Sequence, residues 1–271
     1  MGTLFVVATP IGNLEDVTLR AVRILSEVAL VAAEDTRTAG VFLRHHGLHP
    51  RLLSYTDHNK KERIPQILQR LAEADVALVS DAGTPAISDP GVDLVAAARD
   101  AGFQVVAVPG ASSVVAALSV AGLRCTDFRF VGFLPRGAGE LNSLLKEASA
   151  RSETLVAFEA PGRLRKSLTA IDNAMPRRRL AVCRELTKLH EETFVGTAAD
   201  ALAHFDAPRG EIVLVIEGGE VETAAADETG VREEIAEMKR LGLSRAQAQS
   251  LVERRFGLGR RRFYELWVAS G

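Results

Sequence analysis

The chain has 271 residues, of which 47% are hydrophobic. A chain of this length and composition can bury a large core, and it is longer than one typical domain. No apolar run approaches the roughly 20 residues that span a bilayer, which excludes a membrane partner and favours a cytoplasmic protein. A formal net charge of −2 is unusual for a nucleic-acid binder, because Lys and Arg contact phosphate, so the distribution of charge matters more than its sum.

The first part of the chain alternates short apolar runs with amphipathic segments. Apolar runs at residues 4–8, 29–33, 52–55, 76–80 and 104–108 predict five strands. Apolar residues at helical spacing predict the first connecting helix at residues 16–25. Together these elements predict an N-terminal α/β domain over residues 1–112.

Three loops rich in glycine and proline directly follow predicted strands, at residues 9–13, 81–91 and 109–113. In an open α/β sheet, ligands bind at the carboxyl ends of the strands, so loops at this edge indicate one shared site. Each loop alone could simply link a strand to a helix. The three together favour a stiff cradle of backbone groups that holds a cofactor, and therefore an enzyme.

Several common sites are absent from the sequence. No G-x-G-x-x-G follows the first strand, and neither a P-loop nor a G-x-S-x-G elbow occurs. Cys125 and Cys183 are far apart and flanked by apolar or basic residues, which favours burial. The six histidines lack the spacing of metal ligands, so we expect no metal site.

A second series of strands follows a helix predicted at residues 112–123. The strands are predicted at residues 128–134, 154–158, 180–185, 192–195 and 212–216. They predict a C-terminal α/β domain over residues 113–219, which faces the first domain across a cleft and completes the cofactor site.

The C-terminal region reverses its charge. Residues 218–230 are polar and lack periodicity, which indicates a linker. Residues 217–237 contain eight acids and one base, whereas residues 239–262 contain eight bases and one acid. We therefore expect a separate basic helical module over residues 231–271.

Two helices are predicted in this module. Ser244 and Gln247 form a capping box for the first, and Gly257 can end it. Its apolar face would pack on a second helix through the following side chains: Ala248, Leu251, Val252, Phe256, Phe263, Leu266 and Trp267.

Three consecutive arginines, Arg260, Arg261 and Arg262, stand at the start of the second helix, where their charge opposes the helix dipole. We interpret them, with Arg245 and Arg254, as contacts to an RNA backbone. A solvated basic surface and a dimer contact are the alternatives.

Motifs along the whole chain resemble the tetrapyrrole methylase superfamily. They lie at residues 9–16, 34–37, 80–91, 108–112 and 132–135. Within it, the segments Phe-Glu-Ala-Pro-Gly-Arg at 158–163, Arg-Glu-Leu-Thr-Lys at 184–188 and Gly-Glu-Ile-Val-Leu-Val at 210–215 resemble the bacterial ribosomal RNA small subunit methyltransferase I branch.

The resemblance implies a fold, a reaction and partners. It implies two α/β domains with the cofactor S-adenosylmethionine in the cleft between them. It implies 2'-O-methylation of a cytidine in the decoding region of 16S rRNA in the small ribosomal subunit, and a homodimer. The residues that it places around the cofactor, mostly through backbone, are Pro10, Asp81, Ala82, Gly83, Thr84, Asp89, Ser112, Ser113, Phe133, Leu134, Ala181, Val182, Gly210, Glu211 and Ile212.

Charged residues at predicted strand ends are the candidates for catalysis. We expect five of them on the substrate side, with a carboxylate as general base and the arginines holding phosphate: Glu34, Asp35, Arg37, Glu159 and Arg163. A structural ion-pair network between the domains is the alternative.

Two other functions stay open. One is methylation of a corrinoid or porphyrin, against which the basic C-terminal module argues. The other is a ribosome-assembly factor that binds RNA without catalysis, against which the intact cofactor loops argue.

Overall fold

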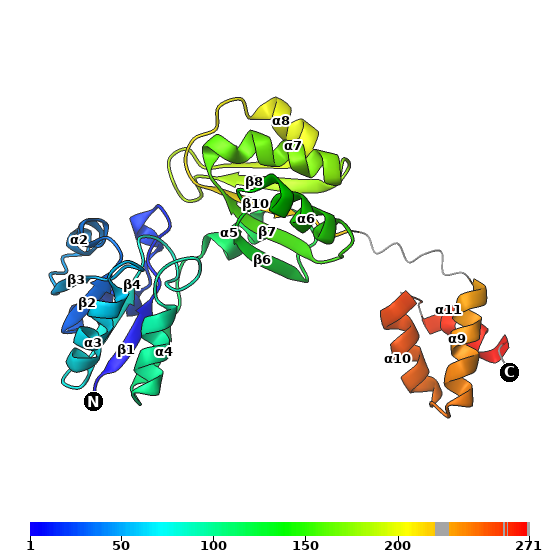
Figure 1. Ribbon diagram of the computed structural model, residues 1–271, viewed down its shortest axis with the longest axis horizontal. Helices are drawn as coiled ribbons and strands as arrows, with labels where there is room; N and C mark the ends of the chain where they lie inside the picture. Colours follow the sequence, from blue (N-terminus) through cyan, green and yellow to red (C-terminus); the bar gives the residue numbers. More distant parts are fainter. Residues whose placement is uncertain (220–227, 257, 259, 270–271) are drawn as a thin grey trace.

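The computed structural model describes residues 1–219, 228–256, 258 and 260–269 (Figure 1). The first part of the chain forms a five-stranded sheet in the order β3-β2-β4-β1-β5, with every pair parallel. Its strands are β1 (Thr3–Val7), β2 (Leu30–Ala33), β3 (Leu52–Ser54), β4 (Val76–Val79) and β5 (Gln104–Val108). The connecting helices are α1 (Leu19–Glu27), α2 (Thr36–His45), α3 (Lys60–Leu71) and α4 (Val92–Asp100).

Side-chain caps determine where the first two helices begin. Thr18 accepts a hydrogen bond from the backbone N–H of Ala21, so α1 starts at Leu19 rather than at the predicted residue 16. Residues Leu14–Asp16 form a separate 3-10 turn. The Asp35 side chain caps α2 by accepting from the N–H of Arg37. Asp35 lies two residues after the end of β2, so this cap starts α2 at the carboxyl edge of the sheet.

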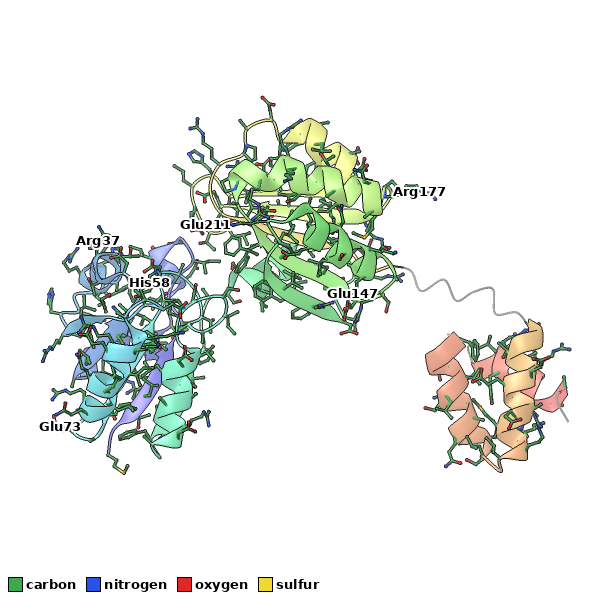
Figure 2. The ribbon with its side chains drawn as sticks, in the orientation of Figure 1. Arg37, His58, Glu73, Glu147, Arg177 and Glu211 are labelled. Atoms are coloured by element: carbon green, nitrogen blue, oxygen red, sulfur yellow. The ribbon has the colours of Figure 1, made fainter. Side chains whose placement is uncertain are left out.

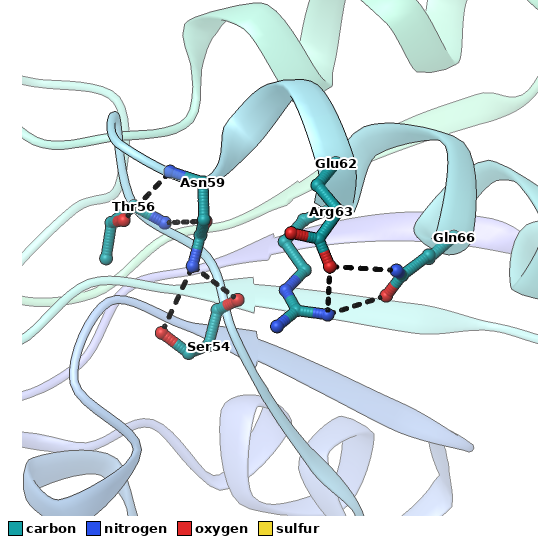
Figure 3. A network of polar contacts seen from close by, with 6 residues as sticks. All are labelled: Ser54, Thr56, Asn59, Glu62, Arg63 and Gln66. Carbon is teal, nitrogen blue, oxygen red and sulfur yellow. Dashed lines mark hydrogen bonds and ion pairs between the residues drawn. The ribbon is translucent and has the colours of Figure 1, made fainter.

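The connection from β3 to α3 is held by side-chain amides (Figure 3). Asn59 donates to the carbonyl of Ser54 at 3.2 Å and accepts from the N–H of Thr56 at 2.8 Å. Arg63 donates to Gln66 at 2.9 Å within α3. These bonds fix a turn at the same edge of the sheet as the glycine-rich loops.

The second sheet has the order β6-β7-β10-β8-β9 and is mixed. The β6 and β7 strands pair in parallel, and the other pairs are antiparallel. Its strands are β6 (Phe128–Phe133), β7 (Thr154–Glu159), β8 (Arg179–Arg184), β9 (Glu192–Thr197) and β10 (Ile212–Ile216). The accompanying helices are α5 (Ser113–Val120), α6 (Ala138–Ser149), α7 (Leu164–Ala174) and α8 (Ala198–His204).

A buried cluster joins the two sheets. Ile11, from the loop after β1, packs in the same cluster as Val114 of α5 and Val213 of β10. These side chains are 7%, 7% and 5% exposed. The loop after β1 is thus held between the two halves, where the predicted site lies.

The C-terminal region forms the helices α9 (Glu228–Arg240), α10 (Arg245–Phe256) and α11 (Arg260–Ala269). The predicted capping box is present: Gln247 N–H donates to Ser244 Oγ at 3.4 Å, and Ser244 N–H donates to Gln247 Oε1 at 3.0 Å. The helices share a core formed by Val231, Ile235, Ala248, Val252, Phe263 and Leu266. Trp267 packs against this core. Gly257 lies outside the described residues. Across the described ranges, no helix is long and apolar enough to cross a membrane.

Candidate functional site

The three glycine- and proline-rich loops meet, as predicted, at one edge of the first sheet. Thr9 and Gly83 exchange two backbone hydrogen bonds, of 2.8 and 3.0 Å, which tie the first loop to the second. The Thr84 hydroxyl donates to the carbonyl of Ala111 at 3.3 Å, which ties the second loop to the third. The loops therefore form one connected backbone cradle.

The backbone of the second loop is strained. Ala86 and Ser88 have φ values of +68° and +63°, a region that residues other than glycine rarely adopt. Gly83 and Gly91 also have positive φ. Strain of this kind persists only where the surrounding structure enforces it, and it clusters at functional sites.

A cavity of about 380 Å³ lies against this cradle. It is lined by Ile11, Ala82, Gly83, Thr84, Ile87, Ser88, Asp89, Ser112, Ser113, Val114, Phe133, Phe158, Glu159, Ala160, Pro161, Gly210, Glu211, Ile212 and Val213. Its volume falls within the about 300–1,000 Å³ of small-molecule sites, and its walls are mainly apolar with a few polar groups, as such sites require. We call it the first cavity.

Ten of the fifteen predicted cofactor residues line the first cavity: Ala82, Gly83, Thr84, Asp89, Ser112, Ser113, Phe133, Gly210, Glu211 and Ile212. Pro10 and Asp81 line a neighbouring cavity instead. Leu134, Ala181 and Val182 are at most 1% exposed and line neither cavity, because their side chains belong to the hydrophobic core.

An aromatic wall of the first cavity was not predicted in full. Phe133 is 60% exposed, and its ring meets that of Phe158 edge-on at 5.5 Å. Gly132, with φ +68°, turns the chain just before Phe133. Phe158 could have been found from the sequence, because it is the first residue of the Phe-Glu-Ala-Pro-Gly-Arg segment. The contact of its ring with Phe133, however, depends on the register between β6 and β7.

A neighbouring cavity, which we call the second cavity, has a volume of about 360 Å³. It is lined by Thr9, Pro10, Ile11, Gly12, Leu14, Thr38, Ala39, Val41, Phe42, Ser80, Asp81, Ala82, Lys188 and Glu211. Ile11, Ala82 and Glu211 line both cavities, so the two adjoin at these residues. No sequence motif predicted the second cavity as a site of its own.

Glu34, Asp81 and Asp89 concentrate negative charge at the carboxyl ends of β2 and β4. Burial raises the pKa of Glu34, and the charges of Asp81 and Asp89 raise it further. Burial also raises the pKa of Asp89, partly opposed by a hydrogen bond from Ser80. Glu34 lines neither cavity, although it lies close enough to Asp81 to respond to its charge.

Asp35 and Arg37 form a surface pair at the start of α2. Arg37 Nη2 lies 2.6 Å from Asp35 Oδ2, and the Arg37 side chain is 90% exposed (Figure 2). Hydrogen bonds from Arg37 lower the pKa of Asp35 to about 2. The N–H of Asp35 donates to Asp81 at 3.0 Å, so the pair adjoins the second loop without lining either cavity.

Glu159 lines the first cavity, yet its carboxylate is buried and engaged. It accepts from the Ser167 hydroxyl and, at 2.7 Å, from the N–H of Ala160. Arg163 lies 3.4 Å away and donates to the carbonyls of Leu134 and Pro135. This arrangement ties the turn after β7 to the end of β6, which indicates a structural role.

The predicted RNA-contact arginines lie on the C-terminal helices. Arg260 and Arg261 are exposed, Arg262 pairs with Glu265 at 2.6 Å, and the Arg245 guanidinium lies 5.7 Å from the Tyr264 ring centre. The side chain of Arg254 lies outside the described residues. Within the described part of the chain, no cluster of three or more potential metal ligands occurs.

Comparison with curated proteins gives close relatives. A model of the tetrapyrrole (corrin/porphyrin) methylase family matches residues 3–202. The ribosomal RNA small subunit methyltransferase I of Synechocystis sp. is 43% identical over 98% of this chain and 97% of its own length. The protein of that name from Thermotoga maritima is 45% identical over 81% of this chain and 100% of its own length.

Solved structures agree on the fold. A diphthine synthase matches with a TM-score of 0.65 at 14% identity, covering 80% of this chain and 90% of that one. The uroporphyrin-III-C-methyltransferase of Thermus thermophilus matches with a TM-score of 0.57 at 22% identity, covering 79% and 94%. Two α/β halves followed by a helical region were predicted, and this fold is confirmed. The chain belongs to the tetrapyrrole methylase family and, within it, to the ribosomal RNA small subunit methyltransferase I family.

Proposed function

We propose that this protein uses S-adenosylmethionine to methylate the ribose 2'-hydroxyl of a cytidine in the decoding region of 16S rRNA. The observation that carries the proposal is a strained, glycine-lined cavity in a chain that is 43% identical, over nearly its full length, to a small-subunit rRNA methyltransferase. The substrate is the small ribosomal subunit or its rRNA, and the protein acts in the cytoplasm.

The first cavity fits S-adenosylmethionine. Gly83 has a φ of +76°, and a Cβ added there would lie 3.3 Å from the Ile11 side chain, so glycine allows this turn of the cavity wall where a larger residue would strain it. Apolar walls at Phe133 and Phe158 suit an adenine ring, and the hydroxyls of Ser112 and Ser113 suit the polar parts. When bound, the cofactor would supply an activated methyl group on a positively charged sulfur.

The protein's contribution is to hold the acceptor in line and to remove its proton. Positioning carries much of the acceleration in such transfers, and a general base contributes further. Glu34, Asp35 and Arg37 stay candidates for the substrate side, because Glu34 and Asp35 adjoin Asp81, which lines the second cavity. For Glu159 and Arg163 the buried pair supports a positioning role for the turn after β7.

We propose that the C-terminal module contacts the RNA backbone. Arg260, Arg261 and Arg245 supply exposed or partly exposed cations on a small independent core. The Thermotoga maritima relative aligns over its whole length with only 81% of this chain, so about a fifth of the chain is additional to that catalytic unit.

We also propose a homodimer. Val115, Val120 and Phe128 on α5 and β6 are 60%, 47% and 44% exposed, and apolar side chains on neighbouring elements favour burial against a second copy. Light scattering tests this proposal by measuring the molecular mass in solution.

The alternative of a tetrapyrrole substrate is tested by offering a porphyrin in the methyl-transfer assay. Methylation of the porphyrin but not of subunits would replace the rRNA proposal.

A further inference from the structure

The Arg-Glu-Leu-Thr-Lys segment after β8 forms a clamp between the two halves. Thr187 Oγ1 accepts from the N–H of Asn13 in the loop after β1, at 3.0 Å. Glu185 and Thr187 have φ values of +52° and +67°, so the backbone of this segment is strained at two residues that are not glycine. Such strain requires strong surrounding contacts and often marks a functional site.

The clamp holds one carboxylate from two sides. Glu185 Oε1 accepts from the backbone N–H of Glu211 at 2.9 Å, and this bond fixes the main chain of Glu211. Lys188 Nζ lies 3.0 Å from Glu185 Oε1 and 3.2 Å from Glu211 Oε2, which fixes the Glu211 side chain. In Figure 2 Glu211 lies on the side of the second half that faces the first.

Among the described residues, Glu211 is the one acidic residue that lines both cavities, and its carboxylate lies 3.2 Å from Lys188, which lines the second. The first cavity also contains Asp89 and Glu159, and the second contains Asp81. The Glu159 carboxylate is fully buried and accepts from Ser167 and Ala160, so it has no direct route for a proton to solvent. The Glu211 side chain is 73% exposed, so it can release a proton to solvent.

The second cavity has the character of a nucleoside site. Leu14, Val41 and Phe42 provide apolar surface, and Thr38 and Asp81 provide hydrogen-bonding groups. Small-molecule sites combine such surfaces in this way. A group held there adjoins the first cavity at Ile11, Ala82 and Glu211.

We propose that the second cavity binds the acceptor ribonucleoside of the RNA and that Glu211, positioned by Lys188, accepts the proton of its hydroxyl. This inference rests on the proposed function. The hydroxyl oxygen forms a bond to the methyl carbon as the carbon–sulfur bond breaks, with its electron pair staying on the sulfur. The hydroxyl proton passes to the Glu211 carboxylate and then to water.

The first test separates proton transfer from binding. Glu211→Gln keeps the shape of the side chain and removes its basicity, so kcat for methylation of small subunits should fall by about 100-fold or more. The cofactor contact predicted at Glu211 is a backbone contact, which this substitution keeps. KM for subunits and the affinity for S-adenosylmethionine, measured by calorimetry, should therefore stay unchanged, and Glu211→Asp should restore part of kcat. Glu73→Gln is the matched control, because Glu73 pairs with Arg70 at the far end of the first sheet (Figure 2).

The second test fills the second cavity. Val41 is 57% exposed on α2, so Val41→Trp adds bulk at the cavity without opening the core. KM for subunits should rise by about tenfold or more while the cofactor affinity stays unchanged, because the apolar contact of the acceptor is blocked. Leu19→Trp, at a residue that is 90% exposed and lines neither cavity, is the control.

Each outcome decides one question. A Glu211→Gln enzyme with kcat within about threefold of the wild type would overturn the role of Glu211, since a general base contributes far more. A Val41→Trp enzyme with unchanged KM, or with reduced cofactor affinity, would overturn the assignment of the second cavity. If the unaltered protein bound S-adenosylmethionine but never methylated subunits, the proposed function itself would fail.

Discussion

Replacing Glu159 by alanine should lower the free energy of unfolding by about 3–5 kcal/mol, the typical cost of removing one partner of a buried pair. The Glu159 side chain is fully buried, and its removal leaves the hydroxyl of Ser167 and the N–H of Ala160 without their acceptor. Each unsatisfied donor costs about 1–3 kcal/mol. Arg163 contributes less, because it is 26% exposed and keeps two carbonyl partners.

Urea denaturation followed by far-ultraviolet circular dichroism measures this change. The single tryptophan, Trp267, lies in α11, so its fluorescence would report the C-terminal module rather than the sheet that contains Glu159. If more than one transition is resolved, each should be fitted separately. The Glu147→Ala control removes a carboxylate whose pairs with Arg129 and Arg151 are exposed, and it should cost far less (Figure 2).

The stability and the activity of the Glu159 variants together distinguish a structural role from a chemical one. Glu159→Gln keeps one acceptor, so it should retain more stability and more methyl transfer than Glu159→Ala. A Glu159→Ala protein that loses less than about 1 kcal/mol, yet no longer transfers methyl groups, would refute the reasoning, because a buried pair costs more to break.

Three further predictions concern charge and backbone. Because the pKa of Glu34 is raised in the folded protein, ionisation of this carboxyl opposes folding, and that cost is absent at pH values below the ordinary pKa of 4.5. Glu34→Gln should therefore raise the urea midpoint at pH 7. The difference in midpoint between the variant and the wild type should vanish on acidification. Gly47→Ala should cost only the about 1–2 kcal/mol of its positive φ. Gly210→Ala adds a clash between the new Cβ and the Glu185 side chain, and it should also weaken S-adenosylmethionine binding in calorimetry. Replacing Arg260 and Arg261 by Gln should weaken subunit binding and reduce the salt slope by about 2.

The backbone site was largely predictable because its signals are local. Glycine and proline directly after an apolar run determine where a loop turns, so the three loops and the strands before them were located to within a residue or two. The Ser244 and Gln247 capping box is equally local, and it is confirmed. The start of α1 was misplaced because the Thr18 cap outweighs the apolar pattern, whose first member is Val17.

Contacts between distant segments were not predictable. Arg163 donates to the carbonyls of Leu134 and Pro135, which precede it by 29 and 28 residues. The position of Glu211 at both cavities depends on the antiparallel pairing of β10 between β7 and β8, whose direction cannot be read from an apolar run. Pairing of this kind involves residues far apart in the chain, and no pattern within one segment encodes it.

The most direct test of the central claim is transfer of labelled methyl from S-adenosylmethionine to purified small ribosomal subunits that lack the modification, followed by mass-spectrometric mapping. We expect label on the ribose of a cytidine in the decoding region. Absence of label on both subunits and naked rRNA, in a protein that still binds S-adenosylmethionine, would contradict it.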